Sequence, residues 1–102
     1  MTIATVKTIK RNDPVREAFS GCSSGNGPDS YYDTKGHAIR AFDDVLADHG
    51  YHLDTMDCNA WSGNEGRNTV DIYNEDAEFV GYAVFYYYRM ESGRYEFVAY
   101  IA

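Results

Sequence analysis

The fold is decided by residues 77–101, which read AEFVGYAVFYYYRMESGRYEFVAYI. Two runs rich in aromatic and β-branched residues flank Glu91-Ser92-Gly93, and this composition favours β-strands. A three-residue turn that ends in glycine is typical of a β-hairpin, because glycine tolerates a positive φ. A third run precedes the Glu75-Asp76 turn. We therefore predict three antiparallel strands at residues 67–74, 77–90 and 94–101.

The two predicted turns set the register of these strands. Met90 lies opposite Arg94 in one hairpin, and Asn74 lies opposite Ala77 in the other. Side chains alternate between the two faces of a sheet, so the register assigns every strand residue to a face. One face then collects Val70, Ile72, Phe79, Gly81, Ala83, Phe85, Tyr87, Tyr95, Phe97, Ala99 and Ile101. The opposite face collects Thr69, Asp71, Tyr73, Val80, Tyr82, Val84, Tyr86, Tyr88, Met90, Glu96, Val98 and Tyr100.

One amphipathic helix is predicted to cover the first of these faces. Apolar residues recur at spacings of three and four from Ala38 to Leu46, after Asp33 or Thr34 as the N-cap and before Gly50 as the terminator. A strand is expected at residues 2–9, a short helix after Asp13 and an irregular connection at 51–67 that includes a short strand at 51–53. We predict an α+β fold: a three- to four-stranded antiparallel sheet with a C-terminal β-meander and one main amphipathic helix packed on one face.

Length and composition predict one domain over residues 1–102, with a flexible Gly/Ser-rich loop at 20–30. No stretch is apolar enough to span a membrane, and the first ten residues do not read as a secretory signal, so a cytoplasmic location is expected.

The net charge is −7, and it is concentrated between residues 43 and 78. This segment contains ten acidic residues, and Arg67 is its one Lys or Arg residue. The negative electrostatic field of these residues repels phosphate backbones and attracts basic protein surfaces, so direct nucleic-acid binding is disfavoured.

The tyrosines on the second face are the most informative feature of the sequence. A face left to water usually carries Thr, Lys and Glu, whereas Tyr is enriched at protein–protein contacts. We expect a partner-binding surface made by Tyr73, Tyr82, Tyr86, Tyr88 and Tyr100. Three alternatives stay open. The face is the seam of a homodimer, or the tyrosines only stabilise the sheet through strand propensity and cross-strand aromatic pairs, or residues 1–19 fold across the face as a second layer. Stacking of nucleobases is disfavoured, because Asp71 and Glu96 lie on the face.

Carboxylates form a second candidate surface on the predicted helix and the loop after it. They are Asp43, Asp44, Asp48, Asp54 and Asp57, joined by Glu65. A row of carboxylates imitates phosphates and binds the Arg and Lys side chains of a nucleic-acid site. The simpler interpretation is a solvated helix face.

Metal chemistry would need a cluster made of His49, His52, Asp54, Asp57 and Cys58. The spacing is not diagnostic, and His49 is better explained by the helix macrodipole at a C-terminus. Nothing in the sequence places a base beside Cys22, so no catalytic residue, metal or cofactor is assigned.

These observations favour a non-enzymatic protein-binding module whose partner has a basic surface. By analogy of size and charge alone, we expect a phage- or plasmid-type inhibitor that occludes the nucleic-acid-binding surface of a host defence enzyme. A small metal-dependent enzyme built on the histidine cluster, and a structural homodimer through the tyrosine face, are the alternatives.

Overall fold

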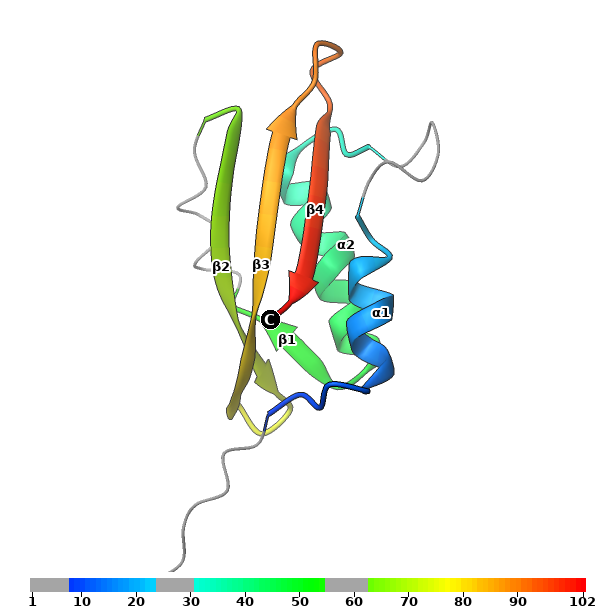
Figure 1. The fold of residues 1–102 in the computed structure, drawn as a ribbon, viewed down its shortest axis with the longest axis vertical. Helices are drawn as coiled ribbons and strands as arrows, with labels where there is room; N and C mark the ends of the chain where they lie inside the picture. The colour runs from blue at the N-terminus through cyan, green and yellow to red at the C-terminus, as the bar shows by residue number, and fades with distance from the viewer. Residues whose placement is uncertain (1–7, 24–30, 55–62) are drawn as a thin grey trace, which may run out of the picture.

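The computed structural model describes residues 8–23, 31–54 and 63–102. Two helices precede a four-stranded antiparallel sheet of order β1-β2-β3-β4, and both helices lie on one side of it (Figure 1). The predicted α+β fold with a C-terminal meander is confirmed. The elements are α1 (Pro14–Ser20), α2 (Lys35–Asp48), β1 (Tyr51–Leu53), β2 (Glu65–Asn74), β3 (Phe79–Arg89) and β4 (Tyr95–Ile101).

The hairpin between β3 and β4 has the predicted register. Arg89 pairs with Tyr95, and the Met90 N–H donates to the Arg94 carbonyl at 2.8 Å. Gly93 has φ +88°, the left-handed conformation for which this turn needs glycine. This pairing places each β4 side chain on the face of the sheet that the sequence predicts.

The hairpin between β2 and β3 differs from the prediction by two residues. Ile72 pairs with Gly81, whereas Asn74 opposite Ala77 would have placed Ile72 against Phe79. The turn is longer because the Asn74 side chain organises it: its Oδ1 accepts from the N–H groups of Asp76 at 2.9 Å and Glu78 at 3.0 Å. An asparagine that satisfies two loop amides favours a wider loop over a tight two-residue turn.

A β-bulge next to this turn exchanges the faces of two predicted residues. The pairing passes from Ile72 with Gly81 to Tyr73 with Phe79, so Val80 is the extra residue. Val80 is 3% exposed and belongs to the core, whereas Phe79 is 46% exposed and packs against Tyr73 with ring centroids 6.2 Å apart. The prediction that Phe79 points inward and Val80 outward is therefore wrong.

Both helices begin where the sequence indicates. Asp13 accepts a hydrogen bond from the Val15 N–H at 2.9 Å, and Thr34 accepts from the His37 N–H at 3.0 Å. Gly50, with φ +83°, follows the C-cap residue of α2. The start of each helix is thus fixed by a side-chain hydrogen bond, and the end of α2 by a glycine in the left-handed conformation.

Four phenylalanines form the centre of the core. Phe42 of α2 contacts Phe85 of β3, with ring centroids 5.1 Å apart, and Phe97 of β4 at 6.5 Å. Phe19 of α1 lies 4.8 Å from Phe42 and 5.7 Å from Phe85. All four rings are fully buried. The predicted burial of Phe85 and Phe97 beneath α2 is confirmed.

The described part of the N-terminal segment packs on the helix side of the sheet. Ile9 lies outside any strand and donates one hydrogen bond to the Val80 carbonyl at 3.0 Å. The Arg16 guanidinium binds the carbonyl groups of Ile9, Lys10, Ile101 and Ala102 at 2.7–3.2 Å. Residues 8–19 therefore do not cover the face of the sheet that carries the exposed tyrosines. Residues 1–7, which belong to the predicted strand and to the predicted cover of that face, lie outside the described residues.

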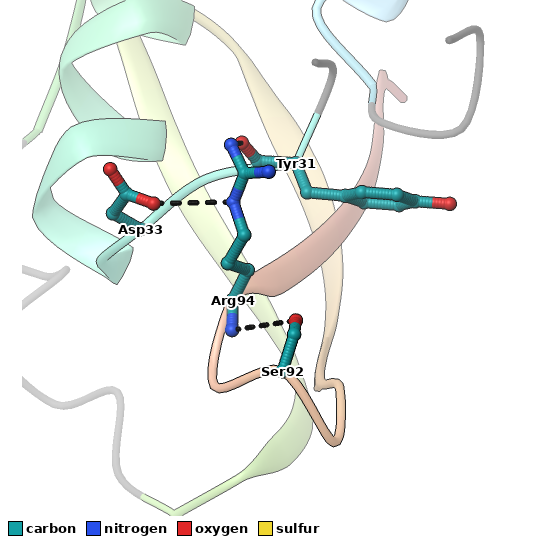
Figure 2. A network of polar contacts seen from close by, with 4 residues as sticks. All are labelled: Tyr31, Asp33, Ser92 and Arg94. Carbon is teal, nitrogen blue, oxygen red and sulfur yellow. Dashed lines mark hydrogen bonds and ion pairs between the residues drawn. The ribbon is translucent and has the colours of Figure 1, made fainter. Parts of the chain in front are cut away.

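Residues near the predicted loop line the outer edge of β4. Ser23 exchanges two hydrogen bonds with the backbone of Ala99, at 3.0 and 3.5 Å. Figure 2 shows Arg94 paired with Asp33 at 3.2 Å, and the Arg94 guanidinium also donates to the Tyr31 carbonyl at 3.1 Å. Residues 20–23 and 31–33 are thus tied to the sheet, while residues 24–30 of the predicted loop lie outside the described part.

Candidate interaction surface

The face of the sheet opposite the helices is rich in exposed aromatic side chains, and we call it the open aromatic face. Tyr82, Tyr86, Tyr88, Val98 and Tyr100 are each 42–50% exposed. Its members, by alternation along the paired strands, are His52 of β1, Glu65, Arg67, Thr69, Asp71 and Tyr73 of β2, Phe79, Tyr82, Val84, Tyr86 and Tyr88 of β3, and Glu96, Val98 and Tyr100 of β4. A contiguous patch of this kind marks an interaction site more often than scattered exposed residues do.

The middle of the open aromatic face is already close-packed. Val84 belongs to it by alternation but is only 2% exposed. Its row partners are Thr69 and Tyr100, and Tyr82 and Tyr86 precede and follow it on the same face of β3. The surrounding side chains cover Val84, so the rings are held against the sheet while their outer halves stay in water. A surface with ordered rings loses little conformational entropy on binding.

Arg67 is a member of this face that the sequence prediction left out. Its Nε–H donates to the Tyr86 Oη at 3.1 Å, and the guanidinium carbon lies 5.7 Å from the centroid of the Tyr86 ring. The hydrogen bond to Tyr86 is the first cause that raises the pKa of Arg67, and the nearby Tyr100 contributes further. The signal was present in the sequence, because Arg67 stands two residues before Thr69 on the same predicted strand.

The predicted acidic surface is divided by the structure. One carboxylate oxygen of Asp43 accepts from the Leu53 N–H at 3.0 Å, so this side chain ties α2 to β1. Asp44 and Asp48 are exposed on α2, and Asp54 is half-buried beside β2. Asp57 lies outside the described residues. Asp43, Asp44 and Asp48 belong to α2, on the helix side of the sheet and away from the tyrosines. Asp54 instead continues the β1 register opposite Asp71, and Glu65 pairs with Tyr88, so these two lie at the edge of the open aromatic face.

The predicted metal cluster is not assembled in the described part of the chain. His49 caps the C-terminus of α2, as expected, and its side chain is exposed. His52 is an exposed residue of β1, and Asp57 and Cys58 fall outside the described residues. Among residues 8–23, 31–54 and 63–102, no group of three His, Cys, Asp or Glu side chains is placed to hold an ion.

Cys22 is held at the edge of the core. Its Sγ lies 3.9 Å from the carbonyl oxygens of Ala18 and Ala41, and the thiol is half-buried. Burial raises the pKa of Cys22 above its ordinary value. A nucleophilic cysteine needs the opposite shift, because the thiolate is the reactive form. The position therefore favours packing over catalysis.

A shallow cavity of about 300 Å³ lies at the β3–β4 hairpin, next to one end of the open aromatic face. Its lining contains no nucleophile paired with a base: Asn64, Tyr88, Arg89, Met90, Glu91 and Gly93. Tyr88 belongs to both the cavity and the face. The cavity is thus continuous with the open aromatic face.

Comparison with protein-family models, with curated proteins and with solved structures gave no match. In the part of the chain that the structure describes, no helix is both long and apolar enough to cross a membrane. Function therefore has to be argued from the surface itself.

Proposed function

We propose that this protein is a non-enzymatic protein-binding module whose open aromatic face is its contact surface. The observation that carries the proposal is the exposure of 42–50% at four tyrosines of adjacent strands, Tyr82, Tyr86, Tyr88 and Tyr100. Tyrosine and arginine dominate the energetics of protein interfaces, and Arg67 stands among these rings. Tyr73 and Phe79 extend the same surface towards β1.

The chemistry of the partner follows from charge. The chain carries −7, and Asp71 and Glu96 lie on the face with the tyrosines. A negative field attracts a basic surface and accelerates its association. Asp44 and Asp48 add to that field from the exposed side of α2, whereas Asp43 is occupied by the backbone of β1. The partner is accordingly a protein with a basic surface.

The finer proposal names the kind of basic surface. A nucleic-acid-binding channel presents Arg and Lys side chains arranged for phosphates, and carboxylates compete for the same groups. The protein would then act as a phage- or plasmid-type inhibitor that occludes such a channel in a host defence enzyme. Its support is the acidity of the chain and its small size.

Site-specific photocrosslinking tests the contact surface. A benzophenone amino acid at the exposed Val98, which pairs with Tyr86 on the face, should capture a partner from extracts of the native host. The matched control carries the same group at the exposed Arg11, in the turn that precedes α1. Mass spectrometry identifies the captured protein, and crosslinking at both positions alike would contradict a specific face.

Affinity measurements with the purified partner complete the test. Tyr82→Ser and Tyr100→Ser should each weaken binding by at least about tenfold, because interface anchors contribute mainly to the complex. The free energy of unfolding should change by less than about 1.5 kcal/mol, since both rings are almost half exposed. Unchanged affinity in both variants would refute the proposed surface.

A further inference from the structure

The open aromatic face carries side chains of both charges that form no ion pair with the described residues. Arg67 uses its Nε–H for Tyr86, and its Nη atoms carry further donors. Among the described residues, no carboxylate lies within 4.0 Å of the Arg67 guanidinium, and Asp71 and Glu96 have no ion pair either. A surface that carries unpaired groups of both signs suits a partner with the complementary pattern.

The register shows where that complementary pattern exists. Three rows cross the sheet one after another: Arg67 with Tyr86 and Val98, then Thr69 with Val84 and Tyr100, then Asp71 with Tyr82. A two-fold axis that lies in the plane of the face, along the central row, turns the first row onto the third. It brings Arg67 of one copy opposite Asp71 of the other, and Tyr86 opposite Tyr82.

We propose that two copies of this chain pair through their open aromatic faces about this two-fold axis. Each of the two symmetric contacts joins Arg67 of one copy to Asp71 of the other. Tyr82 packs against Tyr86 of the second copy, and the two Tyr100 side chains meet near the axis. An isologous interface requires a self-complementary patch, and the three rows supply one.

The acidic residues of α2 do not oppose this arrangement strongly. Both helices lie on the side of the sheet away from the open aromatic face, so they point outward in the dimer (Figure 1). Face-to-face sheets lie about 10 Å apart, and each helix layer lies beyond its own sheet. The two α2 helices, with Asp44 and Asp48, are then separated by more than the Debye length of about 8 Å at physiological salt.

This inference rests on the proposal that the open aromatic face is a contact surface, and it adds how that surface is regulated. A second copy and a basic partner would occupy the same tyrosines, so the two complexes exclude each other. The free chain is stored as a dimer at high concentration, and the partner captures the monomer. Dilution therefore releases the binding surface.

Charge exchange within one chain tests the pairing. Sedimentation equilibrium from about 10 μM to about 1 mM should show a monomer–dimer equilibrium for the natural sequence. Arg67→Asp places two carboxylates opposite each other, and Asp71→Arg places two guanidinium groups opposite each other. Each should raise the dimer dissociation constant by at least about tenfold. The double variant R67D/D71R should return it to within about threefold of the original value, because the pair is restored with its ends exchanged.

Two controls isolate the register. Glu96→Arg changes a charge on the same face, but the proposed axis brings no residue of the second copy opposite Glu96. Arg40→Asp makes the same substitution as Arg67→Asp, at an exposed position of α2. Neither should change the dissociation constant by more than about threefold. Circular dichroism of every variant at low concentration verifies that the monomer stays folded.

Each outcome decides the inference. A natural chain that stays monomeric at about 1 mM overturns it, and so does a double variant that fails to recover. A monomeric chain that still crosslinks a partner through Val98 leaves the proposed function intact. A dimer that recovers by charge exchange but captures no partner supports the inference and removes the basic partner.

Discussion

Phe85→Ala should be among the most destabilising single substitutions in this protein. The side chain is fully buried, and its ring lies 5.1 Å from that of Phe42 and 5.7 Å from that of Phe19. Loss of the buried ring removes about 2–3 kcal/mol of transfer free energy. A remaining cavity of roughly 80 Å³ adds about 2 kcal/mol at about 24 cal/mol per Å³. The expected cost of about 4–5 kcal/mol is a large part of the roughly 5–15 kcal/mol available to a small domain.

Urea denaturation followed by far-UV circular dichroism measures this cost at a concentration where the chain is monomeric. Tyr86→Ala is the matched control, because Tyr86 is the next residue of β3 but lies on the open face and is 42% exposed. It should cost less than about 1.5 kcal/mol. If Phe85→Ala unfolds the protein altogether, Phe85→Leu should still fold with a loss of about 1–2 kcal/mol. Equal losses for the two alanine variants would refute the assignment of faces.

Two further predictions concern the polar contacts of α2 and the buried thiol. Asp43→Ala should lower the free energy of unfolding by about 1 kcal/mol in urea titrations, because a backbone N–H of β1 loses its acceptor, whereas Asp44→Ala should have almost no effect. Burial raises the pKa of Cys22, so the unfolded chain ionises first as the pH rises and stability falls above about pH 9. Cys22→Ala should reduce that decrease between pH 8 and pH 10 in the same titrations, and an unchanged pH dependence would contradict the effect of burial.

The accuracy of the predicted fold differs between the two hairpins. Gly93 specifies a positive φ at one position, so the loop length and the register of β3 with β4 follow from the sequence alone. The loop after β2 has no glycine to fix it. Its length depends on Asn74, whose side chain binds two loop amides, and asparagine occurs in several kinds of turn. That ambiguity produced the two-residue error in register.

The candidate site was predicted where strand alternation is regular and missed where it is interrupted. An even shift of two residues keeps each side chain on its face, so the tyrosines of β3 were placed correctly despite the wrong register. The bulge at Val80 is an odd shift, and it turned Phe79 to the open side. The role of Asp43 was beyond sequence reasoning, because its acceptor contact joins two elements that meet only in the folded chain.

The described part of the N-terminal segment is held on the helix side, away from the open aromatic face. It was the one part of the chain that the sequence offered as a cover for the tyrosines. In its described part, Val15 and Phe19 are buried on the helix side, and Arg16 fastens the segment to the end of β4 through backbone carbonyls. Moving it across the sheet would expose both apolar side chains and break these hydrogen bonds, a cost of several kcal/mol. The tyrosines are therefore left half exposed by residues 8–19, and they contribute less to the stability of the chain than rings of their size would if fully buried.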